Sequence, residues 1–118
     1  MKDTFFYLST CDTCRRIVGE LDLPEEIRLQ DIKTEPLTRE QLHELKDLAG
    51  SYEALFSKRA RLYKERNLKE KALDESDFRD LLLEHYTFLK RPVLVVSGKI
   101  FVGNSRNTVA AAREYLQP

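Results

Sequence analysis

The 118-residue chain has no net charge, because 20 Lys and Arg side chains are matched by 20 Asp and Glu side chains. This balance argues against broad electrostatic capture of nucleic acid or of an anionic membrane. No stretch approaches the roughly 20 apolar residues of a membrane-spanning helix. Residues 1–3 lead into a strand-like run without the apolar segment of a secretory signal. We therefore expect a cytoplasmic protein that binds neither nucleic acid directly nor a membrane.

Cysteine is scarce, and the only two are Cys11 and Cys14. The chain lacks a second Cys-x-x-Cys for a zinc site, and His43 and His85 stand singly without metal-ligand spacing, so we expect no metal. A structural disulfide is disfavoured because no secretory signal precedes the pair. A further alternative is that the two cysteines serve only as small buried hydrophobic residues at the start of a helix. Redox or thiolate chemistry is the leading interpretation.

The Cys-x-x-Cys pair lies between an apolar strand-like run at residues 4–8 and a helical pattern that continues to about residue 22. This context is typical of thioredoxin-like redox motifs. Cys11 falls at or just before the first helical turn, where free backbone N–H groups and the helix dipole favour a thiolate. Cys14 follows three residues later on the same face. We expect Cys11 to be the nucleophile and Cys14 to be able to close a disulfide on an oxidised Cys11.

The remaining pattern predicts a second strand at residues 26–32, which alternates apolar and polar side chains and would pair in parallel with the first. A capping box at residues 38–41 begins a helix that ends at Gly50, and residues 51–56 fit a short helix. The basic run at residues 57–66 has the composition of a solvated helical face.

A further helix begins at Asp74 or Ser76 and extends to about His85, which we interpret as a histidine at the edge of the core. Residues 89–96 and 99–103 then predict a β-hairpin with its turn at residues 97–98. A final helix begins at residues 104–105.

Together these elements predict an α/β protein with a thioredoxin-like fold. Its four-stranded mixed sheet would be built from a βαβ half and a ββα half. No low-complexity linker interrupts the chain. We therefore expect residues 1–118 to form a single domain with a helical insertion at about residues 34–88.

Three motifs in this order resemble the arsenate reductase (ArsC)/Spx family: the Cys-x-x-Cys, Leu-Phe-Ser-Lys-Arg at residues 55–59, and Lys-Arg-Pro-Val-Leu-Val at residues 90–95 with Val-Gly at residues 102–103. The resemblance covers nearly the whole chain. It implies that Cys11 is the nucleophile, that Arg59 and Arg91 hold an oxyanion, and that Pro92 is cis beside the active cysteine. Planar guanidinium groups suit a tetrahedral anion because they bind its oxygens bidentately. The alternative interpretation of Arg59 is that it is simply another exposed basic side chain in the charged run at residues 57–66.

The resemblance implies a thiol-dependent oxidoreductase, similar to the arsenate reductases coupled to glutathione and glutaredoxin. Its substrate would be a small oxyanion or an oxidised thiol, with glutathione/glutaredoxin or thioredoxin as electron donor and no bound cofactor. Two residues depart from the glutathione-coupled enzymes. Asn104 occupies the position of a third arginine, although Arg106 lies nearby, and Cys14 is a feature of the Spx-like regulators.

The second hypothesis is therefore an Spx-like transcriptional regulator that binds the α-subunit of RNA polymerase and uses a Cys11–Cys14 disulfide as a redox switch. Zero net charge agrees with protein contact rather than DNA contact. A third hypothesis is a family member that serves as a structural or interaction module.

Overall fold

The computed structural model describes residues 1–117. They form two compact units, one made of residues 1–35 together with the chain from Arg91 onward, and the other of residues 36–90. The second unit has bounds close to those expected for the helical insertion. That the whole chain acts as a single domain stays a prediction.

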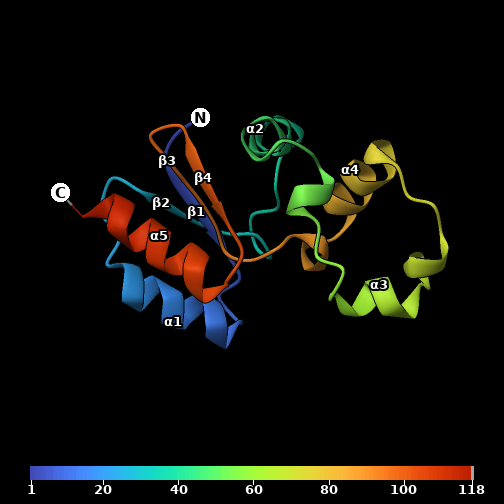
Figure 1. Ribbon diagram of the computed structural model, residues 1–118, viewed down its shortest axis with the longest axis horizontal. Coiled ribbons are helices and arrows are strands. Elements are labelled where there is room, and N and C mark those ends of the chain that lie inside the picture. The colour runs from blue at the N-terminus through green and yellow to red at the C-terminus, as the bar shows by residue number, and fades with distance from the viewer. Residues whose placement is uncertain (118) are drawn as a thin grey trace. The chain divides into compact units, whose positions relative to one another are not determined.

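The first unit contains a four-stranded mixed sheet with strand order β2-β1-β3-β4 (Figure 1). Its strands are β1 (Thr4–Tyr7), β2 (Arg28–Asp31), β3 (Val93–Val96) and β4 (Lys99–Val102). β1 pairs in parallel with β2 and antiparallel with β3, which pairs antiparallel with β4. The predicted α/β fold with a βαβ half and a ββα half is confirmed.

Helices α1 (Asp12–Leu21) and α5 (Arg106–Leu116) lie side by side against the sheet (Figure 1). Phe5 on β1 is opposite Leu94 on β3, and both belong to the buried cluster that the helices cover. Ile17 and Leu21 are four residues apart and therefore share the inner face of α1. Phe6 points to the opposite face of the sheet from Phe5 and is equally buried, which explains why the apolar residues of β1 are consecutive.

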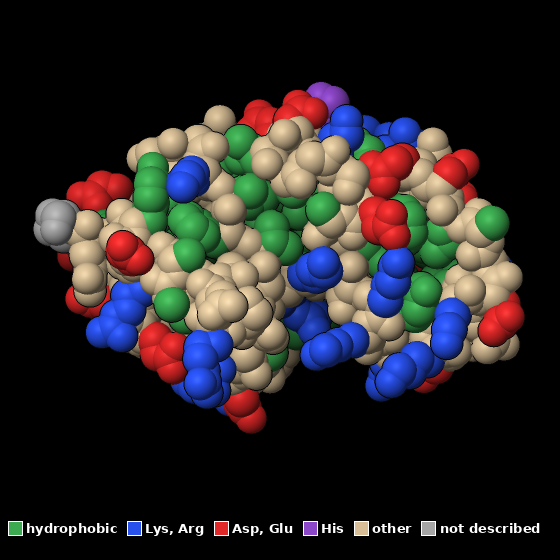
Figure 2. All heavy atoms as spheres, in the orientation of Figure 1, with side chains coloured by type: hydrophobic (Ala, Val, Ile, Leu, Met, Phe, Trp, Pro, Cys, Tyr) green, Lys and Arg blue, Asp and Glu red, His purple; other side chains and the backbone are tan. Residues whose placement is uncertain are grey.

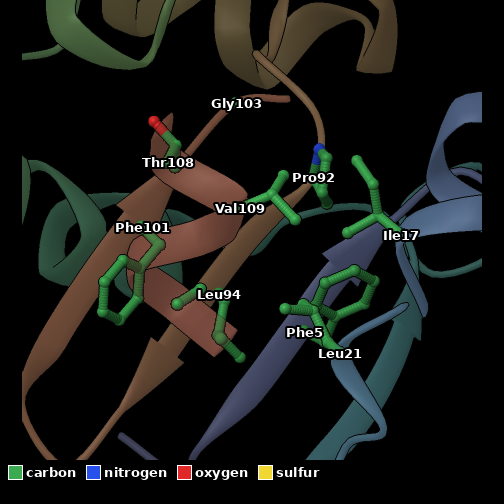
Figure 3. Close-up of a pocket in the computed structure, with 10 residues that line it drawn as sticks. Phe5, Ile17, Leu21, Pro92, Leu94, Phe101, Gly103, Thr108 and Val109 are labelled. Atoms are coloured by element: carbon green, nitrogen blue, oxygen red, sulfur yellow. The ribbon is translucent and has the colours of Figure 1, made fainter. Parts of the chain in front are cut away.

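Between these helices and the sheet lies an apolar hollow of about 10 Å³, the lower limit of room for one water molecule (Figure 3). Among its lining residues only Thr108 carries a polar side-chain group. The hollow is a packing gap in the core rather than a substrate pocket.

The second unit consists of α2 (Arg39–Ala49), α3 (Arg61–Glu65), α4 (Glu75–Glu84) and the short 3-10 helices η1 (Glu53–Leu55), η2 (Leu68–Glu70) and η3 (Tyr86–Phe88). The predicted capping box is present on α2, where Thr38 and Gln41 exchange hydrogen bonds. The helix ends at Gly50, whose φ of 101° is one that residues with a side chain rarely adopt. Of the two proposed starts for α4, the structure has Asp74, which makes a second capping box with Asp77.

Three predicted elements are shorter than expected. β2 begins at Arg28 and not at residue 26, because the Ile27 N–H closes a turn onto the Pro24 carbonyl. Within residues 57–66 only α3 is α-helical, and it buries none of its residues. β3 begins at Val93 and not at residue 89, because Leu89 forms an isolated bridge with Phe56 in the helical unit.

Basic and acidic side chains both occur on the face shown in Figure 2, in keeping with the zero net charge. Among residues 1–117 no helix is long and apolar enough to cross a membrane. In the same range, no group of three or more His, Cys, Asp and Glu side chains is arranged to hold a metal ion.

Candidate active site

The loop between β1 and α1 presents Cys11 at the start of the helix. The Cys11 N–H donates to the Leu8 carbonyl at 3.0 Å and closes a tight turn over residues 8–11. The Cys11 carbonyl accepts from the Arg15 N–H at 3.1 Å, and Cys11 has the extended backbone conformation of an N-cap residue. As the sequence predicts, Cys11 immediately precedes α1.

The two cysteines are close together but differ in environment. Both are free thiols, and their side chains are hydrogen-bonded to each other. Cys14 is completely buried, whereas Cys11 is partly exposed. An attacking reagent can therefore reach Cys11 more easily than Cys14.

The surroundings of Cys11 favour its thiolate. Partial burial works against the charge, but it is outweighed by the backbone N–H and the thiol of Cys14, by the backbone N–H of Thr13 and by the positive charge of Arg91. Thr13 and Cys14 belong to the first turn of α1, where the helix dipole also favours a negative charge. The net effect is a pKa of Cys11 below the ordinary value of a thiol.

Cys14 has the opposite character. Burial raises its pKa to about 11, and the neighbouring Cys11 also acts to raise it. The Leu8 backbone and the charge of Arg91 act in the opposite direction, but they do not outweigh burial. Cys14 therefore stays protonated at neutral pH and is the thiol that donates to the Cys11 thiolate. The pair consists of one reactive sulfur and one protonated sulfur.

Arg91 lies two residues before the start of β3 and is partly buried. Its peptide bond to Pro92 is cis, as the family resemblance implies. Within residues 1–117, Arg91 forms no ion pair with a carboxylate, so its charge acts on the two cysteines without a neutralising partner. Asn104, which the sequence analysis placed at the position of a third arginine, and Arg106 are both exposed. The structure thus brings Cys11, Cys14 and Arg91 together.

Arg59 belongs to the helical unit. It is exposed, and it lies in a turn where the Ala60 N–H donates to the Ser57 carbonyl at 3.4 Å. Within the described part of the chain it has no carboxylate partner. Its participation in oxyanion binding stays a prediction.

Two polar residues of the loop region were given no role by the sequence analysis. The Ser9 hydroxyl donates to Oδ2 of Asp31 at 2.5 Å. Because β1 and β2 run in parallel, their C-terminal ends meet at one edge of the sheet. Because a serine follows β1 and an aspartate ends β2, the predicted parallel pairing of these strands could have indicated that the two side chains lie close together.

A βαβ-ββα sheet with a thiol of lowered pKa just before its first helix, a second thiol three residues later and an arginine before the cis proline defines a thioredoxin-like thiol protein. The ArsC family model matches residues 6–112, and the chain belongs to this family.

The global transcriptional regulator Spx of Streptococcus pyogenes serotype M1 is 25% identical over 117 residues, an alignment that covers 95% of this chain and 87% of that protein. The arsenate reductase from Vibrio cholerae has a similar structure, with a TM-score of 0.77 and 20% identity over 95% of this chain and 98% of that one. An arsenate reductase (ArsC) related protein from Brucella melitensis gives a TM-score of 0.71 and 24% identity over 94% and 93% of the two chains. At these identities the structural matches show the shared fold alone.

Proposed function

We propose that this protein is a thiol oxidoreductase that reduces arsenate or a related oxidised acceptor through Cys11. The observation that carries the proposal is the asymmetric thiol pair: a partly exposed Cys11 whose pKa is lowered, next to a buried Cys14 whose pKa is raised to about 11. A nucleophilic thiolate is what the first step requires. Membership of the ArsC family and the arsenate reductases of similar fold support the choice of acceptor.

In the proposed first step the Cys11 thiolate attacks arsenic(V), forming an S–As bond while an arsenic oxygen, once protonated, leaves as water. In the second step a thiol attacks the Cys11 sulfur. An S–S bond forms, the S–As bond breaks, and its electron pair passes to arsenic, which leaves as arsenite. The attacking thiol belongs to glutathione or to Cys14, and glutaredoxin or thioredoxin then reduces the disulfide.

Arg91 has two roles in this proposal. Its charge already stabilises the Cys11 thiolate. Having no carboxylate partner among residues 1–117, its guanidinium is available to bind the oxygens of an incoming anion. Arg59, also without such a partner, is the second arginine proposed to hold the oxyanion.

The test is arsenate-dependent NADPH consumption by the purified protein, coupled separately to glutathione with glutaredoxin and to thioredoxin. We expect turnover with one of the two systems. Cys11→Ser should abolish it, and Arg91→Lys should reduce it because a lysine keeps the charge but loses the bidentate fork. Arg113→Lys, at an exposed position on α5, is the matched control and should leave turnover unchanged. Full activity of Cys11→Ser would refute the proposal.

The second candidate is a redox-switched transcriptional regulator, supported by the similarity to Spx and by the presence of Cys14. In this case oxidation would join the two sulfurs, and a protein partner would distinguish the disulfide from the dithiol. A pull-down with the α-subunit of RNA polymerase, run under oxidising and reducing conditions, tests it. Binding that depends on redox state and disappears in Cys14→Ser favours the regulator, whereas no binding in either state counts against it.

A further inference from the structure

The loop that carries Cys11 leaves the sheet directly beside Asp31. Tyr7 and Asp31 are partners at the ends of the parallel strands β1 and β2. The Ile32 N–H donates to the Tyr7 carbonyl at 2.9 Å and continues the ladder by one further bond. The Asp31 carboxylate therefore lies beside the first residues of the turn at residues 8–11.

That carboxylate binds Ser9, in the turn at residues 8–11, through two groups. Its Oδ2 accepts from the Ser9 hydroxyl at 2.5 Å, and the Ser9 backbone also interacts with it. Its Oδ1 accepts from the Lys33 N–H at 3.2 Å. The pKa of Asp31 is held below its usual value, mainly by the hydrogen bond from the Ser9 hydroxyl. Burial opposes this effect, and the backbone groups of Lys33 and Ser9 add to it.

The chain that carries Asp31 is itself firmly held. The Asp31 carbonyl accepts from the Glu35 N–H at 2.8 Å and from the Thr34 hydroxyl at 3.3 Å. The Gln30 side chain donates to the Glu35 carbonyl at 3.1 Å, and it is almost completely buried. A carboxylate on such an ordered turn can fix the position of a neighbouring loop.

We propose that the Ser9–Asp31 hydrogen bond is a positioning contact of the active site, holding the turn at residues 8–11 so that the Cys11 sulfur stays beside the N–H groups that begin α1. Ser9 and Asp31 touch no reacting atom in this proposal. They act through the backbone of the turn, which is closed by the Cys11 N–H. The inference rests on the proposed thiolate function of Cys11.

The experiment measures the rate at which iodoacetamide alkylates Cys11 between pH 5 and 9, with peptide mapping to separate Cys11 from Cys14. In Ser9→Ala we expect the rate at pH 6 to fall about five-fold and the midpoint of the pH profile to move upward, because losing a bond to a charged group relaxes the turn. Thr10→Ala is the matched control, because it removes a hydroxyl from the same turn. The Thr10 hydroxyl is exposed and has no hydrogen-bond partner among residues 1–117. This variant should behave like the wild type, and Ser9→Thr should restore most of the rate.

The Asp31→Ala variant distinguishes a positioning role from a purely electrostatic one, because the two explanations predict opposite changes in the alkylation rate of Cys11. A positioning contact predicts slower alkylation of Cys11. Removal of a repelling negative charge alone would stabilise the thiolate and make alkylation faster. Faster alkylation in Asp31→Ala, or a Ser9→Ala profile identical to that of the wild type, would overturn the inference.

Two further measurements separate a failure of this inference from a failure of the proposed function. Hydrogen exchange of the Cys11 amide reports directly on the turn and should be faster in Ser9→Ala but not in Thr10→Ala; equal exchange in the two variants argues against the inference. A wild-type profile with its midpoint at an ordinary thiol pKa would instead reject the proposed thiolate function. The two failures are therefore distinguishable.

Discussion

Replacing Cys14 with alanine tests whether the buried thiol stabilises the Cys11 thiolate. The substitution removes the S–H donor but keeps the Cys14 backbone N–H, which is the larger of the two contributions from that residue. Hydrogen bonds to charged groups contribute roughly 1.5–3 kcal/mol, and S–H is a weak donor, so we take about 1 kcal/mol for this one. At 1.36 kcal/mol per pKa unit, the pKa of Cys11 should rise by about 0.7 unit.

The assay is the pH dependence of Cys11 alkylation by iodoacetamide. On the acidic side of the midpoint, a shift of about 0.7 unit lowers the rate about five-fold. Thr13→Ala is the matched control, because Thr13 acts on Cys11 through its backbone N–H, which the substitution retains. Cys14→Ser retains a donor and should shift the midpoint less than Cys14→Ala. An unchanged midpoint in Cys14→Ala, with the fold verified by circular dichroism, would refute this reasoning.

Three further predictions follow from the structure. Arg91→Met should raise the pKa of Cys11 whereas Arg91→Lys should not, because the effect of Arg91 on the thiolate is Coulombic; alkylation profiles of both variants measure it. Thr38→Ala removes the N-cap of α2 and should lower the free energy of unfolding by about 1 kcal/mol in urea titrations, with the exposed residue Arg39→Lys as a neutral control. Ser9→Ala should be less stable than the wild type above the unfolded pKa of Asp31, about 3.9; since the folded pKa is lowered, the difference should vanish as the pH falls through it, which urea titrations from pH 7 to pH 2 would detect.

Local sequence signals were sufficient where one segment determines its own structure. The capping box at Thr38 begins α2, and Gly50 ends it, because both act on backbone groups within one helical turn. The place of Cys11 before α1 follows from similarly local information. The pairing within each half of the sheet was also predictable, because a βαβ unit implies a parallel pair and a tight turn implies an antiparallel one. The antiparallel pairing of β1 with β3, which sets the strand order, does not follow from either rule.

Contacts between distant residues were not predictable in the same way. Leu89 has the apolar character of a strand residue, but it pairs with Phe56, which lies 33 positions earlier, so the expected start of β3 was wrong. The Ser9–Asp31 bond joins residues 22 positions apart and needs the register of β1 and β2. The difference in pKa between Cys11 and Cys14 depends on complete burial of one sulfur, which a Cys-x-x-Cys pattern alone does not determine.

The same difference bears on which thiol completes the proposed reaction. With a pKa of about 11, only about one Cys14 in ten thousand is a thiolate at pH 7. Burial, the largest cause, persists throughout the reaction, whereas the repulsion from the Cys11 thiolate disappears once that sulfur has bonded to arsenic. Cys14 therefore becomes more reactive after the first step but stays less ionised than an external thiol with an ordinary pKa. We expect Cys14→Ser to retain most of its arsenate-dependent turnover when glutathione is supplied, while Cys11→Ser retains none. Equal loss in both variants would show that burial does not restrain Cys14 and that the internal disulfide is obligatory.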